Sequence, residues 1–143
     1  MHYFTDENDT GHSDYEQYCR SIWAELSPAL KMIQGGMLPD DIFDVETVYW
    51  FHDGRILSYE EGEDIVLKIG FEHENDWKKI NLVYKKAEIT KLVNEQRLTN
   101  TPEEPNNDIM CHELIKINSG YTHSFLFASG EELQISFLDL EIK

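Results

Sequence analysis

The chain has 143 residues, enough for one domain with a single hydrophobic core. Hydrophobic residues make up 41% of it, which argues against a disordered chain. Its 12 Lys and Arg stand against 28 Asp and Glu, and the formal charge of −16 repels nucleic acid and anionic membranes. The same charge would attract a basic partner, or it would serve only to keep the protein soluble.

The cysteines and the N-terminal segment indicate where the protein works. Cys19 and Cys111 are too few for a disulfide scaffold, and neither belongs to a Cys-x-x-Cys pair. The N-terminus lacks the basic start and apolar centre of a signal peptide. No apolar stretch approaches the roughly 20 residues of a membrane span. We therefore expect a cytoplasmic protein.

The N-terminal part predicts two short helices. Residues 1–12 are polar and acidic and are expected to form a flexible arm. Ser13–Glu16 has the pattern of a capping box that begins the first helix. Ser27-Pro28 begins the second helix, which ends at Gly35-Gly36. Residues 13–36 therefore form amphipathic helices that cover a sheet.

Residues 50–143 are expected to be rich in β-strand. A long polar loop, Asn94–Asp108, divides this part and is expected to be mobile. The apolar alternation slips by one residue near Lys85-Lys86 and near Phe137, which predicts two bulges. Short turns between consecutive strands indicate an antiparallel, mostly up-and-down sheet, so the chain is predicted to be one α+β domain. We expect about six strands: Arg55–Glu60, Asp64–Phe71, Lys79–Leu92, Ile109–Ile117, Tyr121–Phe127 and Glu132–Ile142.

The sequence His52-Asp53-Gly54-Arg55, at the entry to the first strand, gathers residues that could do chemistry. Metal-dependent phosphohydrolases use His-Asp pairs, but on helical scaffolds and with further ligands. The alternative is structural: Asp53 caps a turn at Gly54, Arg55 pairs with Asp53, and His52 satisfies a buried carbonyl. The structural interpretation is preferred, with no catalytic residue assigned.

A metal site could also be assembled in space from His52, His112, Glu113 and His123, since imidazole and carboxylate groups bind zinc or iron. The spacing of these residues does not demand a site, and no His-Glu-x-x-His or Cys-x-x-Cys motif is present. Neighbouring residues on a strand face opposite sides, so Cys111-His112 is not a catalytic dyad. We therefore predict no cofactor.

Three segments together resemble a loose group of small bacterial proteins of unknown function. They are Leu26-Ser27-Pro28, Phe51-His52-Asp53-Gly54-Arg55-Ile56 and Gly120-Tyr121-Thr122-His123, and the likeness spans about Ser13 to Ile142. It departs at Asn94–Asp108 and in the stretch before Trp50. Proteins of this kind occur among the immunity genes of polymorphic toxins, so the resemblance implies a bacterial binding protein rather than an enzyme.

These observations lead to one main hypothesis and two alternatives. The main hypothesis is a non-enzymatic, acidic protein of the bacterial cytoplasm that binds a basic protein, such as a toxin for which it is the immunity partner. The first alternative is a metal-dependent hydrolase that uses a His/Asp site. The second is a small-molecule-binding domain with its pocket between helix and sheet.

Overall fold

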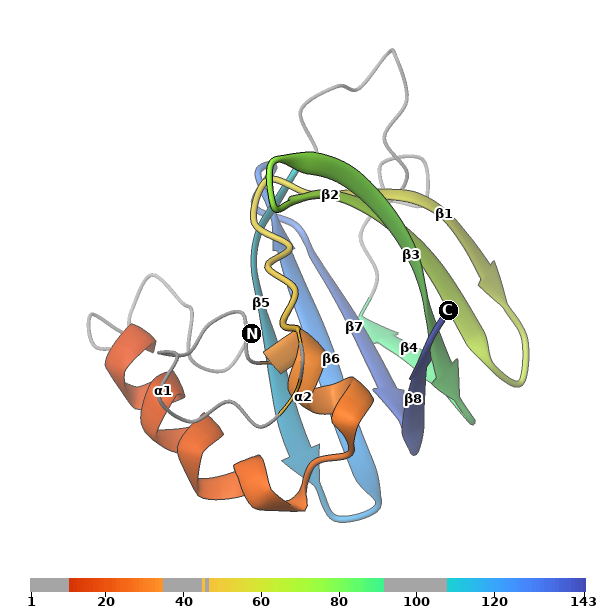
Figure 1. Ribbon diagram of the computed structural model, residues 1–143. Helices are drawn as coiled ribbons and strands as arrows, with labels where there is room; N and C mark the ends of the chain where they lie inside the picture. The colour runs from red at the N-terminus through yellow and green to blue at the C-terminus, as the bar shows by residue number, and fades with distance from the viewer. Residues whose placement is uncertain (1–10, 35–44, 46, 92–107) are drawn as a thin grey trace.

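The computed structural model describes residues 11–34, 45, 47–91 and 108–143, and this part of the chain forms two short helices beside two antiparallel sheets (Figure 1). The expected α+β class and the antiparallel pairing are confirmed. The strands divide between two sheets of four, however, instead of forming one sheet of about six.

Each sheet contains one three-stranded meander and one strand contributed by the other half of the chain. The order in the first sheet is β1-β2-β3-β8, and in the second it is β4-β7-β6-β5. The first sheet consists of β1 (Arg55–Glu61), β2 (Ile65–His73), β3 (Asp76–Lys85) and β8 (Asp139–Ile142). The second consists of β4 (Glu88–Lys91), β5 (Ile109–Ile117), β6 (Gly120–Phe127) and β7 (Glu132–Phe137).

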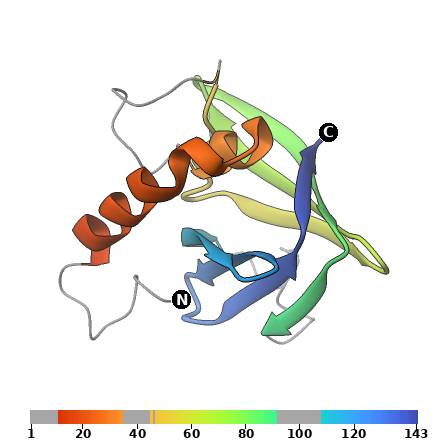
Figure 2. The same ribbon diagram turned by 90° about the horizontal axis from the view of Figure 1, so that it is seen from below.

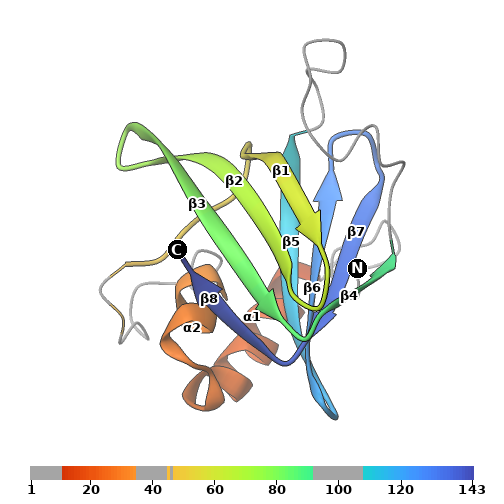
Figure 3. The same ribbon diagram turned by 90° about the vertical axis from the view of Figure 1, so that its right-hand side faces the viewer.

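The two extra strands arise because two long strands bend from one sheet into the other. The expected strand Lys79–Leu92 is split into β3 and β4, and Glu132–Ile142 is split into β7 and β8. The breaks fall where the alternation slips, and Lys86 there has a positive φ of 48°. The Leu138 amide donates to the Lys85 carbonyl at 3.0 Å, so both bends share one corner. Figure 3 shows β4 and β8 leaving this corner in opposite directions.

A second contact joins the sheets at the start of β1. The Asp53 amide donates to the Ile109 carbonyl at 2.8 Å, and the Ile109 amide donates to the Gly54 carbonyl at 2.8 Å. The first residues of β5 are thereby tied to the turn that precedes β1. The sheets are thus linked at both sides, as in a flattened barrel.

The helices are α1 (Gly11–Ile22) and α2 (Pro28–Gln34), joined through the 3-10 turn Trp23–Glu25. The predicted start of α1 at a Ser13 capping box is wrong, because the helix already includes Gly11. The predicted start of α2 is confirmed, and the Leu30 amide donates to the Ser27 hydroxyl oxygen at 3.4 Å. The expected flexible arm, residues 1–12, is wrong at residues 11 and 12, which belong to α1. The rest of that arm, the end of α2 at Gly35-Gly36 and all of the loop Asn94–Asp108 except Asp108 lie outside the described residues.

Helix α1 lies along the open edge of β5, and α2 lies near β8 (Figures 1 and 2). The Leu114 amide donates to the Tyr15 hydroxyl at 2.7 Å, and the Lys116 amide donates to the Tyr18 hydroxyl at 2.6 Å. The Gln34 side-chain amide donates to the Leu114 carbonyl at 3.4 Å. Unpaired groups at a sheet edge invite pairing with another chain, so these bonds protect the edge of β5.

Buried side chains from the helices and from both sheets form one core between the sheets. The alternating residues expected to share faces supply it, among them Ile65, Leu67, Ile69 and Phe71 of β2 and Leu133, Ile135 and Phe137 of β7. In the described part of the chain, the helices are too short and too polar to cross a membrane.

Candidate functional site

The segment His52–Arg55 forms a clasp between the start of β1 and the start of β5. His52 Nδ1 lies 2.7 Å from the Met110 carbonyl oxygen, to which it donates, and Arg55 Nε donates to Asp108 Oδ1 at 3.0 Å. The predicted pairing of Arg55 with Asp53 is wrong, because Asp53 has a positive φ of 63° and is not extended. The Asp53 carboxylate instead lies 3.6 Å from His52 Nε2, and its side chain is 74% exposed.

Gly54 in this clasp has no room for a side chain. A Cβ atom there would lie 2.8 Å from the Phe51 carbonyl oxygen and 3.0 Å from the Gly70 carbonyl oxygen. These are backbone atoms of the turn and of β2, so they cannot move aside cheaply. The segment His52–Arg55, whose residue types suggest a reactive site in the sequence, therefore holds the two sheets together.

A second group of sequence candidates lies in the core. His112 of β5 and His123 of β6 are buried, and His112 Nδ1 lies 3.0 Å from His123 Nε2. The other nitrogen of His123, Nδ1, lies 2.7 Å from the hydroxyl oxygen of buried Tyr84 on β3. The three side chains thus form a polar chain from the first sheet to the second.

One direction of donation along this chain leaves the fewest groups unsatisfied. If Tyr84 donates to His123 Nδ1 and His123 Nε2 donates to His112 Nδ1, only the N–H at His112 Nε2 lacks an acceptor among the described residues. The reverse direction would also leave the Tyr84 proton without an acceptor. Burial lowers the pKa of His112 from 6.5 to about 4, and burial lowers the pKa of His123 as well. Both imidazoles are therefore neutral near pH 7.

The four sequence candidates for a metal site do not come together. His52 belongs to the clasp, and Glu113 follows His112 on β5 and so faces the opposite side of the sheet. Within residues 11–34, 45, 47–91 and 108–143, no three His, Cys, Asp or Glu side chains are placed to hold one ion. The described arrangement brings together only His112 and His123.

The face of the second sheet that is turned away from the core carries two hollows. Its strand register aligns Glu113 with Ser124 and Gln134, and Ile115 with Thr122, Ser136 and Glu88. Alternate residues of the same strands enter the core. We call this surface the outer face, and it comprises Glu88, Thr90, Glu113, Ile115, Ile117, Thr122, Ser124, Gln134 and Ser136.

A row of hydrogen bonds crosses the outer face toward Glu113. The Thr90 hydroxyl donates to Gln134 Oε1 at 3.0 Å, and Gln134 Nε2 donates to the Ser124 hydroxyl oxygen at 3.1 Å. Ser124 stands opposite Glu113 on the neighbouring strand, and both are buried. The row fixes the Gln134 and Ser124 side chains beside a carboxylate that is 0% exposed.

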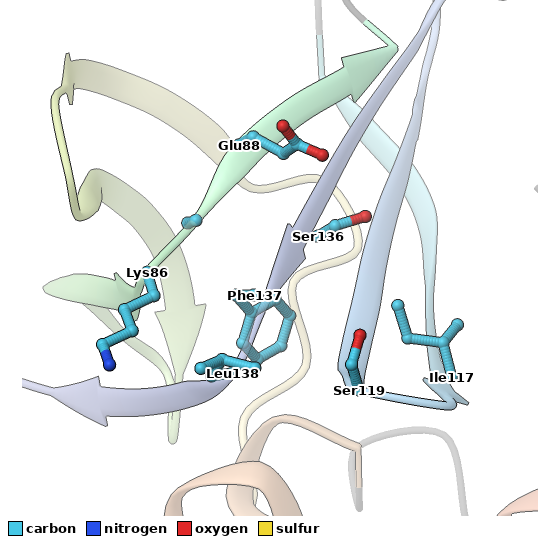
Figure 4. Close-up of a pocket in the computed structure, with 8 residues that line it drawn as sticks. Lys86, Glu88, Ile117, Ser119, Ser136, Phe137 and Leu138 are labelled. Carbon is cyan, nitrogen blue, oxygen red and sulfur yellow. The ribbon is translucent and has the colours of Figure 1, made fainter.

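Two hollows lie on this face and share Ile117 as a wall. One has a volume of about 340 Å³ and is lined by Tyr18, Glu113, Ile115, Lys116, Ile117, Thr122, Ser124 and Gln134. The other, of about 240 Å³, is lined by Lys86, Ala87, Glu88, Ile117, Ser119, Ser136, Phe137 and Leu138 (Figure 4). In Figure 4 the Glu88 carboxylate and the Ser136 hydroxyl project to the same side, and the Lys86 ammonium projects away from them.

The hollows carry exposed apolar side chains next to negative charge. Ile117 is 38% exposed and Leu138 is 47% exposed, which is high for residues of their size.

Cys111 lies at the start of the same strand as Glu113, and burial followed by repulsion from Glu113 raises its thiol pKa to about 11. The thiol is therefore protonated near neutral pH, and its nucleophilicity is low.

Sequence reasoning found Glu113 only as a metal ligand and did not find the rest of the outer face. The signal was present in the residues between the core positions: Thr122 and Ser124 alternate with His123 and Phe125, and Gln134 and Ser136 alternate with Leu133, Ile135 and Phe137. Such alternation marks a sheet with one solvated face.

Comparison of the chain with protein-family models, with curated proteins and with solved structures finds no match. The assignment of a function therefore rests on the residues and on their geometry.

Proposed function

We propose that this chain is a non-enzymatic binding protein that neutralises a basic protein, as the immunity partner of a toxin in the bacterial cytoplasm. The outer face of the second sheet is the surface that would contact the partner. The observation that carries the proposal is the combination, on this one face, of two hollows, exposed Ile117 and the exposed carboxylate of Glu88.

The charge of the chain supports the proposal. A formal charge of −16 on 143 residues raises the encounter rate with a cationic partner, and such steering is strongest at low ionic strength. Steering alone gives no stable complex, because exposed charges are screened over roughly 10 Å at physiological salt. A stable complex also needs apolar contacts that exclude water, and the outer face offers Ile115, Ile117 and neighbouring Leu138 for this purpose.

The geometry of the outer face also suits a protein partner. The hollows are shallow features of a β-sheet surface, and their volumes of about 240 and 340 Å³ are at or below the lower end of the range for drug-sized ligands. A partner protein could insert single side chains into both hollows at once. Of these two hollows, the small-molecule alternative would use the larger one, where Tyr18 of α1 meets the sheet.

The hydrolase alternative finds no support in the described residues. His112 and His123 are buried and neutral, and His52 is held in the clasp by the Met110 carbonyl. Glu113 faces away from both buried histidines, so the expected His/Asp site is not assembled from these side chains.

The test is affinity capture from a lysate of the source organism at about 50 mM and about 500 mM salt, a range over which screening increases strongly. The proposal expects a stoichiometric protein with a high pI that is retained at low salt and weakened at high salt, and whose toxicity on expression is relieved by this chain. A toxin gene adjacent to the gene of this chain would agree with it. If no salt-sensitive protein partner is retained and no such gene is adjacent, the proposal fails.

A further inference from the structure

We infer that the smaller hollow is the place where the outer face receives one arginine side chain of the basic partner. This inference rests on the proposed function and specifies which chemical group of the partner is recognised. Three features of the hollow carry it: an exposed carboxylate, hydroxyl groups beside this carboxylate, and exposed apolar side chains in the lining.

Glu88 supplies the attraction for a cation. Its side chain is exposed on β4, and it forms no ion pair or hydrogen bond with the other side chains that the structure describes. Lys86 also lines the hollow, but Figure 4 shows its ammonium group projecting away from the Glu88 carboxylate. The Glu88 charge is therefore open to a cation from outside, whereas it repels a carboxylate or a phosphate group.

The hydroxyl groups favour arginine over lysine. Ser136 stands opposite Glu88 on the neighbouring strand, and its hydroxyl projects to the same side as the Glu88 carboxylate (Figure 4). Ser119, in the turn between β5 and β6, lines the same hollow. A guanidinium group carries five N–H donors in a planar fork and can bond several acceptors at once, whereas an ammonium group is a compact point charge. A carboxylate with hydroxyl groups beside it therefore suits arginine.

The apolar lining suits the stem of this side chain. Ile117 and Leu138 both line the hollow and are 38% and 47% exposed. Arginine buries its methylene groups on apolar surface while its charged end stays on polar groups. A bound arginine would cover part of this exposed apolar surface, and the volume of about 240 Å³ leaves room for one such side chain.

The backbone of the chain itself shapes this hollow. A Cβ atom at Gly120 would overlap the Phe137 carbonyl oxygen, so only glycine lets the β5–β6 turn pack this closely against the end of β7. The same packing holds Ser119 and Ile117, which precede Gly120, at their places in the lining. Because these groups are already in position, less ordering opposes the binding of a partner.

The direct test is an NMR titration of the full chain with N-acetyl-arginine methylamide at fixed ionic strength. The citrulline analogue keeps the shape and lacks the charge, and the lysine analogue keeps the charge and lacks the planar fork. We expect saturable shifts of the Glu88, Ser119 and Ser136 amides with the arginine probe, and binding at least about threefold weaker with either analogue. Absence of saturation up to about 100 mM, or equal binding of either analogue, would overturn the inference.

Two variants and one control make the test specific. Glu88→Gln removes the charge with little change of shape, and Ser136→Ala removes one hydroxyl group. Each should weaken the arginine probe at least about threefold, since each removes a hydrogen-bond acceptor of the guanidinium group. Glu60→Gln removes the same charge from β1 and should leave the binding of the probe unchanged. If Glu88→Gln or Ser136→Ala binds the probe as the wild type does, the inference is wrong.

A captured partner separates this inference from the proposed function. When the surface arginines of the partner are replaced by lysine one at a time, one replacement should weaken binding at least about threefold, and Glu88→Gln should abolish this difference. If no replacement weakens binding while Glu88→Arg still does, this inference is wrong and the proposed function stands.

Discussion

The buried histidine pair makes the stability of the protein depend on pH in a direction set by the structure. His112 and His123 lie in the core, and His112 contacts Phe51 and Phe125. Burial holds the pKa of His112 near 4 in the folded chain, against 6.5 in the unfolded chain, and it lowers the pKa of His123 as well. In mildly acidic solution the unfolded chain therefore binds more protons than the folded chain, and its stability falls as the pH falls.

The magnitude follows from the same pKa values. Each pKa unit is worth about 1.4 kcal/mol, so His112 alone can lower the free energy of unfolding by about 3 kcal/mol once the pH is below 4. At pH 5 its share is about 2 kcal/mol, because the folded imidazole remains mostly neutral there. His123 adds to the loss in the same direction. The contribution of neutral His112 to the free energy of unfolding is complete above pH 6.5 and is lost between pH 6.5 and about 4.

The assay is urea unfolding at several pH values between about 7.5 and 5, followed by tryptophan fluorescence. Acidification also protonates carboxylates and relieves repulsion within this acidic chain, so wild type must be compared with a matched variant. The triple variant Tyr84→Phe, His112→Phe and His123→Leu removes the whole polar chain without leaving one member unpaired. His52→Gln, at the exposed clasp, is the control for loss of a histidine.

Wild type should lose at least about 2 kcal/mol more than the triple variant over this pH range, and His52→Gln should behave as wild type. Parallel pH profiles for wild type and the triple variant would refute the reasoning. That result would mean that protonation of the imidazoles in the folded chain costs little free energy, which contradicts their burial in the structure.

Four further predictions concern the clasp and the thiol. Gly54→Ala should lower the free energy of unfolding, measured with urea, by more than about 1 kcal/mol, because its Cβ would meet backbone oxygens. Asp53→Gly should leave the melting temperature unchanged or raise it, whereas Asp53→Ala should cost about 1 kcal/mol, since Asp53 has a positive φ. Arg55→Met should cost about 1 kcal/mol or less in urea unfolding, because its pair with Asp108 is partly exposed, and a larger loss would show that the clasp depends on this ion pair. Cys111 should react with a disulfide reagent more slowly than a free thiol at pH 7.5, with a rate that rises toward pH 11; fast reaction at neutral pH would contradict its raised pKa.

The strands could be predicted from sequence because alternation of apolar residues is a local property. The bends near Lys85-Lys86 and Phe137 also left a local signal, the slip in alternation, but a slip looks the same whether a strand bulges within one sheet or passes into another. The outcome depends on the partner strand, and here both long strands bend at one corner, where the Leu138 amide meets the Lys85 carbonyl. Neither segment alone shows that the two bends meet.

The candidate site was harder to predict, since its contacts join distant residues. Proximity in sequence pairs Arg55 with Asp53, yet its carboxylate partner in the structure is Asp108, 53 residues away. The meeting of His112 and His123 depends on the register of β5 and β6, which the sequence did not settle. The sequence marks the outer face only by Ser, Thr and Gln at alternate positions, which is a weaker signal than a histidine.

We propose that a basic partner docks on the outer face of the second sheet. The most direct measurement is the association rate constant of the purified partner with wild type, Glu88→Arg and Glu60→Arg, over about 20 to 500 mM salt. Both variants change the net charge equally, and both sites are exposed, but Glu88 lies on the outer face and Glu60 on β1 of the first sheet.

The proposal predicts that Glu88→Arg slows association and speeds dissociation, for a loss of affinity of about tenfold or more, whereas Glu60→Arg causes only a small, salt-dependent slowing. Equal effects of the two variants would mean that only the total charge matters. A larger effect of Glu60→Arg would place the partner on the first sheet and contradict the account.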